Sequence, residues 1–233
     1  MNILIIIPTY NEAENVEALI SQIYDIVGYV SILVIDDNSP DGTYKIVENI
    51  AKKNEKVFVL KREGKLGLAS AYITGMKWGI KKGFDVFCEM DADFSHNPRY
   101  LSKMIEKIKD NEVVIGSRNI NGGAVQGWSL LRNLISKGGS LYSRFVLGFP
   151  PVYDLTGGYN MWTLNALDKI KIDSIVSEGY CFQIEMKYKA WKQGCSIVEI
   201  PILFENRRKG KSKMSLKIFL EAFVKIWEIK NGK

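Results

Sequence analysis

Short apolar runs and segments of helical spacing alternate along the first half of the chain. The runs are typical of strands buried on both faces of a parallel sheet; they lie at residues 3–7, 31–35, 57–60, 85–90 and 113–115. Between them, apolar residues recur every three or four positions, as in helices with one buried face; these segments are 16–23, 44–53, 68–82 and 98–110. Asn11 is a candidate cap for the first helix. The alternation predicts a doubly wound, largely parallel α/β sheet flanked by helices.

The pattern is less regular after residue 116. It predicts helices over 129–147, with a soft point at Gly138 and Gly139, and over 178–193, followed by a strand over 196–204. A last helix with one apolar stripe is expected over 214–230, packed mostly on the core. Because no repeat or linker divides the sequence, we expect one domain, 1–233, with two functional halves that meet near residue 116.

Composition changes the picture of partners more than that of the fold. The net charge of +6 favours an anionic partner, which leaves nucleic acid, phosphorylated substrates and acidic lipid surfaces open. Three cysteines without paired spacing predict free thiols rather than a disulfide framework. No basic leader precedes Ile3, and no apolar stretch reaches the roughly 18 residues that span a bilayer. We therefore expect no transmembrane domain.

Carboxylates follow three of the predicted strands. The first strand is followed by Glu12, and the others by acidic segments at 36–41 and 91–93. Because ligands collect beyond the carboxyl ends of parallel strands, these groups should meet at one edge. Crowded carboxylates repel one another unless a cation joins them, and Mg²⁺ or Mn²⁺ prefers such oxygen ligands. An aspartate in a loop is more often a turn or cap residue, so it is the position beside two other acidic strand ends that favours a metal site at Asp91 and Asp93.

Two common nucleotide-binding motifs are absent from the sequence. The first predicted strand is followed by Pro8 and Tyr10, where a dinucleotide-binding fold would carry closely spaced glycines. No phosphate-binding P-loop motif occurs either. Any nucleotide must therefore be bound in another way.

Segments at these strand ends and further downstream resemble the inverting GT-A glycosyltransferases and, more narrowly, the dolichyl-phosphate (polyprenol-phosphate) mannosyltransferases. In chain order they are 8–12 (PTYNE), 36–43 (DDNSPDGT), 65–67 (KLG), 91–98 (DADFSHNP), 116–118 (GSR), 154–159 (DLTGGY), 179–185 (GYCFQIE) and 207–213 (RRKGKSK). The resemblance covers essentially the whole chain. It implies a GT-A-type, Rossmann-like fold with a nucleotide-sugar-binding half, 1–116, and an acceptor-binding half, 117–233.

The resemblance also implies an activity, the transfer of mannose from GDP-mannose to the phosphate of dolichol or another polyprenol, with inversion. The protein would work on the cytoplasmic side of a membrane, as a peripheral protein or with a membrane-anchoring partner. Transfer from a UDP-sugar of the glucose type to the same acceptor stays open. A basic nucleic-acid-binding domain is disfavoured, because it would interleave aromatic residues with its cations, so no nucleic acid is expected as a partner.

Family positions suggest the site residues. The donor nucleoside would be surrounded by Pro8, Tyr10, Glu12, Ile35 and Asp37. The segment Asp91, Ala92 and Asp93 would meet the diphosphate, and Asp91, Asp93 and Ser95 would hold Mg²⁺ or Mn²⁺. Phosphate and sugar groups would be bound by Arg118, Arg132, Ser136, Arg207 and Lys213. The catalytic residues would be Asp91, Asp93, Arg118 and Arg132.

Two positions depart from the family pattern. Ser95 stands where many relatives have glutamine, and Asn160 stands where an arginine is common, which puts a role for Asn160 in doubt. A phosphate acceptor is already an anion, so the reaction requires no strong general base. We therefore interpret His96, the one histidine in the sequence, as a structural group beside the metal loop.

Overall fold

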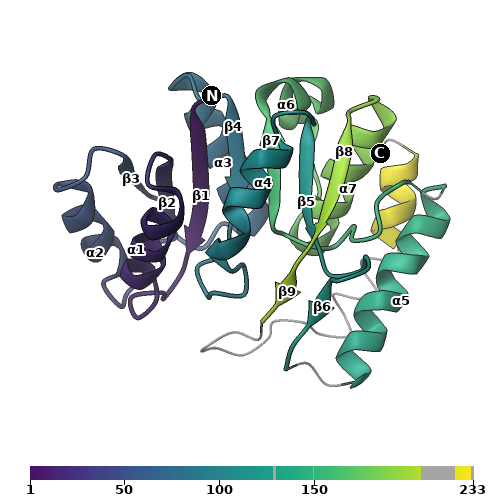
Figure 1. Cartoon of the computed structure of the whole chain (residues 1–233), viewed down its shortest axis with the longest axis horizontal. Coiled ribbons are helices and arrows are strands. Elements are labelled where there is room, and N and C mark those ends of the chain that lie inside the picture. Colours follow the sequence, from purple (N-terminus) through teal and green to yellow (C-terminus); the bar gives the residue numbers. More distant parts are fainter. Residues whose placement is uncertain (128–129, 149, 206–223, 232–233) are drawn as a thin grey trace.

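The centre of the computed structural model, which describes residues 1–127, 130–148, 150–205 and 224–231, is a seven-stranded sheet (Figure 1). Its strand order is β3-β2-β1-β4-β7-β5-β8. The bounds are β1 (Ile3–Thr9), β2 (Ser31–Asp36), β3 (Val57–Lys61), β4 (Val86–Glu89), β5 (Val113–Ser117), β7 (Asn160–Thr163) and β8 (Ile197–Pro201). Only β7 runs antiparallel to its neighbours, β4 and β5. The predicted, largely parallel sheet is therefore confirmed.

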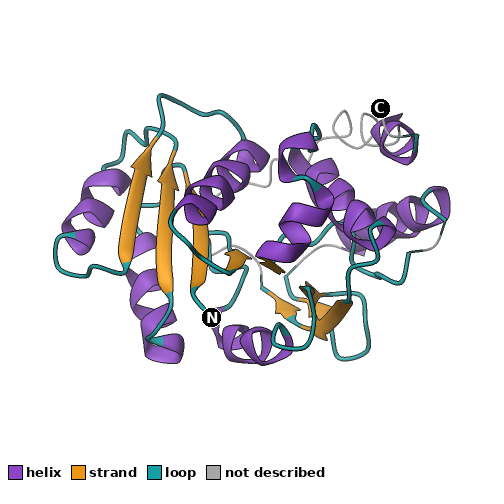
Figure 2. Cartoon of the chain, turned by 90° about the horizontal axis from the view of Figure 1, so that it is seen from above, coloured by secondary structure: helices purple, strands orange, loops and turns teal. Residues whose placement is uncertain are grey.

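Helices cover both faces of the sheet (Figure 2). Alternate residues of β1 point to opposite faces, so Leu4 and Ile6 belong to one core cluster and Ile5 belongs to the other. The first cluster is covered by α3 (Leu68–Lys81), α6 (Leu164–Ile170) and α7 (Gly179–Lys192), and by the end of α5 (Leu130–Val146). The second is covered by α1 (Val16–Val27), α2 (Thr43–Ala51) and α4 (Leu101–Lys107). The continuous apolar runs of the sequence reflect this burial on two sides.

Helix α3 packs unusually close to the sheet. A side-chain carbon at Gly75 would lie 2.6 Å from Ile6 Cγ2, and one at Gly79 would lie 2.6 Å from Leu4 Cδ2. Glycine is therefore required at both positions for this approach. The close packing brings Tyr72, on the same helix, into the core beside the end of β4.

Three local predictions are wrong. Asn11 does not cap the first helix, which starts at Val16 after Asn15; it has a positive φ of 62°, and its N–H donates to the Ser39 hydroxyl. The glycine pair at 138 and 139 does not soften its helix, since α5 runs through it and a packed helix tolerates the propensity cost of glycine, about 1 kcal/mol each.

The third wrong prediction is the single strand over 196–204. It is divided into β8 and a short strand, β9 (Leu203–Phe204), which pairs in parallel with β6 (Ala124–Val125) beyond the lower edge of the main sheet in Figure 1. The division lies at Ile202, whose N–H donates to Ser117 O and whose carbonyl accepts from Ala124 N. The chain thus passes from one sheet to the other at this residue.

Two other predictions can be compared with the structure. The three cysteines are buried and unpaired, as expected. Of the helices within the described ranges, none is both long enough and apolar enough to cross a membrane.

Candidate functional site

The loops that follow β1 and β2 interlock at the carboxyl edge of the sheet. Backbone N–H groups of the first loop donate to side chains of the second, from Asn11 to Ser39 Oγ and from Glu12 to Thr43 Oγ1, both at 3.0 Å. The adjacent strand β4 pairs with β1, so its loop opens on the same edge. The convergence of acidic strand ends that the sequence predicts is therefore present.

Two of the converging aspartates accept hydrogen bonds from the loop after β2 and from residues in and after β1. The carboxylate of Asp36 is buried and accepts from Thr9 Oγ1 at 3.0 Å, and from the backbone N–H and hydroxyl of Ser39 at 2.9 and 2.5 Å. Asp41 accepts from Ala13 N and from both donors of Thr43. Burial opposes ionisation of Asp41, but the hydrogen bonds from Thr43 and Ala13 outweigh it and lower its pKa. Both carboxylates hold the turn together.

Asp37 is paired with an arginine that the sequence analysis did not single out. Its carboxylate lies 2.5 Å from the guanidinium of Arg62, and both side chains are buried. Arg62 also donates to Ser70 Oγ at 2.8 Å and to Gly67 O at 3.0 Å. The arginine thus joins the end of β2 to the start of α3. Its signal in the sequence is weak, because a lone arginine after a strand is usually solvated.

The five residues predicted to surround a nucleoside lie close together. Pro8 and Ile35 face each other in register on β1 and β2, and Thr9 O accepts from Asp37 N. Tyr10 is exposed, and Lys65 Nζ lies 4.5 Å from the centre of its ring. Glu12 accepts from Asn15 at 2.8 Å. An exposed aromatic face such as that of Tyr10 can stack against a nucleobase.

The loop after β4 presents a second pair of aspartates. Asp91 accepts from the buried Tyr72 hydroxyl at 3.0 Å, and 29% of its side chain is exposed. Asp93 is buried, and its Oδ1 accepts from Ser95 N at 3.0 Å and from the Ser95 hydroxyl at 2.5 Å. Ala92, which lies between them in the sequence, and Ser95 are both buried. The serine hydroxyl therefore fixes the orientation of Asp93.

His96 supports this loop from beneath. It is 2% exposed, its Nδ1 accepts from Asp91 N at 2.9 Å, and its ring stacks on Tyr159 with centroids 4.9 Å apart. Burial lowers the pKa of His96 despite the opposing charges of Asp91 and Asp93. A neutral imidazole with the proton on Nε2 satisfies these contacts. This geometry agrees with the interpretation of His96 as a structural group.

Arg118, at the end of β5, forms a buried ion pair with Asp154. Its Nε and Nη2 donate to the two carboxylate oxygens at 2.7 Å each, and Nη2 also donates to Thr156 Oγ1 at 2.8 Å. Burial alone would raise the pKa of Asp154, but the Arg118 guanidinium lowers it well below its ordinary value. Two motifs that are far apart in the sequence, at 116–118 and 154–159, are thereby one structural unit.

The structure describes less of the remaining predicted residues. Ser136 is half-buried on α5. Arg132 lies on the same helix, but its side chain is outside what the structure describes. Arg207 and Lys213 lie outside the described residues altogether. The roles of these four positions stay predictions.

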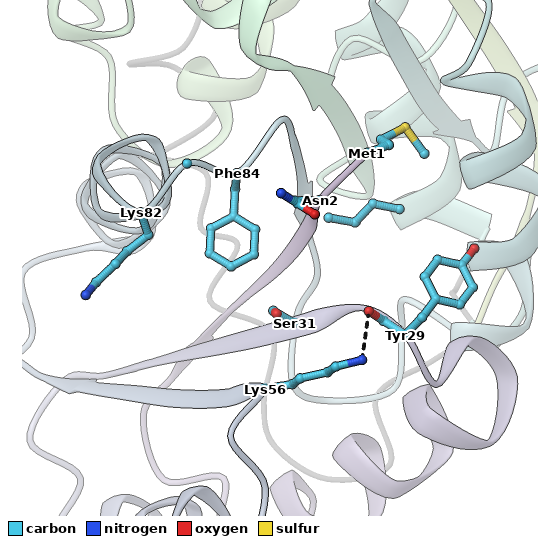
Figure 3. A pocket seen from close by; sticks show the side chains of 9 residues that line it. Met1, Asn2, Tyr29, Ser31, Lys56, Lys82 and Phe84 are labelled. Atoms are coloured by element: carbon cyan, nitrogen blue, oxygen red, sulfur yellow. Dashed lines mark hydrogen bonds between the residues drawn. The ribbon is translucent and has the colours of Figure 1, made fainter.

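A hollow of about 330 Å³ is shown in Figure 3. It is lined by residues that precede β1, β2 and β4, among them Asn2, Tyr29 and Phe84. These are the amino ends of parallel strands, whereas the acidic loops follow the carboxyl ends. The hollow is therefore not part of the candidate site.

The donor set of the β4 loop can be compared with what a metal requires. Within the described ranges, no three His, Cys, Asp or Glu side chains gather as a complete metal cage. Two carboxylates, Asp91 and Asp93, are the usual protein share of a site whose other ligands are substrate phosphates and water. The residues present fit a hard divalent cation that binds together with a phosphorylated ligand.

Comparison with known proteins gives consistent results. A model of the family "Glycosyl transferase family 2" matches residues 4–170. The chain is 41% identical over 227 residues to the polyprenol monophosphomannose synthase of Mycolicibacterium smegmatis, covering 97% of this chain and 85% of that protein. It is 43% identical over 226 residues to the undecaprenyl-phosphate mannosyltransferase of Micrococcus luteus, covering 97% and 93%.

Solved structures share the fold. Mannosyl-3-phosphoglycerate synthase from Rubrobacter xylanophilus superimposes with a TM-score of 0.68 at 17% identity, over 97% of this chain and 72% of that one. The mannosyltransferase PcManGT from Pyrobaculum calidifontis, solved with GDP-Man and Mn²⁺, has a TM-score of 0.59 at 15% identity, over 98% and 69%. The GT-A-type fold predicted from the sequence is confirmed.

Proposed function

Because the chain belongs to glycosyl transferase family 2, we propose that this glycosyltransferase moves mannose from GDP-mannose to the phosphate of a polyprenol such as dolichol or undecaprenol. The observation that carries the proposal is identity above 40% along 97% of the chain with two enzymes named for mannose and a polyprenyl phosphate. We assign donor binding to residues 1–116 and acceptor binding to residues 117–233.

The donor is proposed to bind across the ends of β1, β2 and β4. The base would lie on Tyr10 beside Asp37, with Pro8, Glu12 and Ile35 around the nucleoside. The diphosphate would reach Ala92 and the acidic pair, where Asp91 and Asp93 would hold Mg²⁺ or Mn²⁺. When bound there, the cation would neutralise the diphosphate that leaves with the nucleotide. The contact between Ser95 and Asp93 supports a positioning role for the serine rather than direct ligation.

The acceptor phosphate would attack the anomeric carbon directly, and a single displacement of this kind inverts the configuration. The phosphate is already an anion, so no group has to remove a proton from it. The buried, neutral His96 agrees with this scheme, because its Nδ1 is occupied by the Asp91 backbone. The cationic residues Arg118, Arg132, Arg207 and Lys213, with Ser136, are proposed to orient the two anionic substrates. The two hydrogen bonds to Asp154 would hold the Arg118 guanidinium in a fixed orientation for this role.

A peripheral membrane contact is proposed for the outer face of α5. Leu141 and Phe145, four positions apart on this helix, are 60% and 66% exposed. Trp227, which is 48% exposed, donates to Tyr142 OH at 3.0 Å and so ties the segment near the end of the chain to α5. Exposed apolar residues on a net-basic protein favour an acidic lipid surface, which we place on the cytoplasmic side. A membrane-anchoring partner protein would use the same face.

The experiment is mannosyl transfer by purified protein, with radiolabelled GDP-mannose, undecaprenyl phosphate in detergent, and Mn²⁺ or Mg²⁺. We expect lipid-extractable radioactivity that depends on both the acceptor and the cation. A parallel reaction with UDP-glucose tests the other donor class, and product from that donor alone would contradict GDP-mannose as the donor. No product from either donor, together with salt-sensitive binding to single-stranded nucleic acid, would favour the binding-domain alternative instead.

A further inference from the structure

Asn160 occupies a central position between the two halves of the sheet. It is the first residue of β7, it is fully buried, and it pairs with Glu89 on one side and Ile115 on the other. Glu89 is the last residue of β4, two positions before Asp91. Ile115 is on β5, three residues before Arg118. The inserted antiparallel strand thus connects the strand of the acidic pair to the strand of the buried arginine.

The side chain of Asn160 is the donor at the centre of a buried polar network. Its Nδ2 lies 2.7 Å from Glu89 Oε2, 2.7 Å from Gln183 Oε1 and 3.2 Å from Gly157 O. Glu89 and Gln183, on β4 and α7, are 0% and 4% exposed. An amide nitrogen has two hydrogens, so these acceptors use its full capacity. In such a low-dielectric setting, loss of this N–H donor leaves Oε2 of the buried Glu89 with the longer hydrogen bond from Trp162 Nε1, at 3.3 Å.

A buried lysine holds the adjacent loop from the same side. Lys187 is 0% exposed, and its Nζ donates to the carbonyls of Asp154 at 2.8 Å, Leu155 at 3.4 Å and Gly157 at 2.6 Å. Gly157 O therefore accepts from both Lys187 and Asn160. The loop 154–158 is fixed from beneath by these two side chains and at its start by Arg118.

This loop lies close to His96, which supports the acidic pair. A side-chain carbon placed on Gly158 would lie 3.4 Å from His96 Cε1 and 3.9 Å from Gln183 Nε2. His96 in turn accepts from the backbone of Asp91. A displacement at Asn160 would therefore reach the acidic loop by two routes, through Glu89 along β4 and through Gly158 and His96.

We propose that Asn160 is a positioning residue that fixes the acidic loop 91–96 relative to the loop 154–158 and its partner Arg118, and so sets the distance between the leaving diphosphate and the acceptor phosphate. The inference rests on the proposed function. The asparagine joins Glu89 and Gln183 by hydrogen bonds, and it shares the acceptor Gly157 O with the buried Lys187.

The first test is Asn160→Leu, which removes the hydrogen-bond donor of the side chain and keeps its approximate volume. A misplacement of reacting groups by about 1 Å can cost on the order of 10²-fold in rate, so we expect a kcat loss of that order in mannosyl transfer. The affinity for GDP with Mn²⁺, measured by calorimetry, should stay within about threefold, because the contacts that bind the nucleotide before the reaction are retained. Val114→Ala, on β5 opposite Met161, is the control. It opens a cavity in the same sheet, should lower the melting temperature, and should keep kcat.

The second test exchanges the hydrogen-bond donor and the hydrogen-bond acceptor between positions 160 and 89. Asn160→Asp places a second carboxylate against Glu89 and should lose activity at least as strongly as the leucine variant. Adding Glu89→Gln places a hydrogen-bond donor opposite the new acceptor. If the two residues act as a pair, kcat of the double variant should be about tenfold higher than that of Asn160→Asp. If Asn160→Leu does not fold, this comparison carries the test.

The outcomes separate the two claims. Wild-type protein that makes no lipid-linked mannose would contradict the proposed function. Active wild type, with full kcat in folded Asn160→Leu or with a double variant no better than Asn160→Asp, would overturn the positioning role alone.

Discussion

The loops after β2 and β4 carry aspartates at the same edge of the same sheet, yet the structure uses the two sets differently. In the β2 loop, Asp36 and Asp41 accept hydrogen bonds from neighbouring threonines, serine and backbone N–H groups, which hold the loop together. In the β4 loop, Asp91 keeps 29% of its side chain exposed, and Ser95 orients Asp93. Residue type alone therefore does not distinguish a carboxylate that builds a loop from one that we propose binds a ligand. Asp93 and Asp41 each accept from the N–H and hydroxyl of the residue two positions further on, so the difference between the loops rests on Asp91, whose partner Tyr72 lies on α3.

The largest effect is expected from Asp93→Ala in the β4 loop. Removal of a group that stabilises developing charge typically costs 10²–10³-fold in rate, and we expect a loss of mannosyl transfer of about that size in folded protein. The buried N–H and hydroxyl of Ser95 also lose their acceptor, which should cost about 1–3 kcal/mol of unfolding free energy, as in Asp36→Ala. Initial rates over a Mn²⁺ titration measure the loss of transfer. Asp110→Asn, at an exposed position, is the matched control. Undiminished activity in Asp93→Ala would remove the distinction between the two loops.

The next effect concerns a carboxylate that is purely internal, Asp154. Asp154→Asn leaves the buried Arg118 without its counter-charge, and breaking such a pair costs about 3–5 kcal/mol of unfolding free energy. Denaturant unfolding measures the loss. Because the folded pKa of Asp154 is lowered, its stabilisation is present above its ordinary pKa, near 4, and is lost as pH falls below that value. The variant should therefore lose less stability than wild type on acidification, and equal acid sensitivity would contradict the assignment.

A smaller effect on stability is expected from Asp36→Ala in the β2 loop. The substitution leaves Thr9, Ser39 and its backbone N–H without their acceptor, which costs about 1–3 kcal/mol. Chemical unfolding gives the stability, and transfer assays below the melting temperature give the rate. We expect the rate per folded molecule to change far less than in Asp93→Ala. A rate loss as large as that of Asp93→Ala would show that the β2 loop acts in catalysis directly.

The smallest effect is expected from Asp41→Ala, which removes the acceptor for Thr43, at the start of α2, and for Ala13, in the loop after β1. Loss of hydrogen bonds of this kind costs about 1 kcal/mol. The pKa of Asp41 is lowered in the folded state, so its contribution should fade as pH drops through the acidic range. The difference in melting temperature between wild type and variant should accordingly shrink between neutral pH and about pH 3. A constant difference would argue that Asp41 acts through packing instead.

Much of the fold follows from patterns within the chain. The runs that became β1 to β5 are apolar on both sides, and the helices between them carry apolar residues at helical spacing. The strand β7 was not predicted, because its four residues, NMWT, are too few to show a period. Its place in the sheet depends on the two strands that flank it. Asn160 therefore gave no sign of its contacts with Glu89 and Gln183.

The candidate site was predictable in location but less so in detail. Motif positions indicated Asp91, Asp93 and the residues at the ends of β1 and β2, and the structure brings these together. They did not indicate Tyr72, Arg62 or Lys187, whose partners come from other elements. The sequence does carry two weaker signals of such contacts, the hydroxyl of Tyr72 within the apolar face of a helix and the charge of Glu89 inside a strand. Each predicts a partner from another element, because buried polar groups require partners.

The most direct test of the difference between the two loops is Mn²⁺ binding in the presence of GDP, measured by titration calorimetry on wild type, Asp93→Ala and Asp36→Ala. We expect one Mn²⁺ site per chain in wild type and in folded Asp36→Ala, and no measurable site in Asp93→Ala. Retained binding in Asp93→Ala, or equal loss in both variants, would contradict the assignment of the metal to the β4 loop.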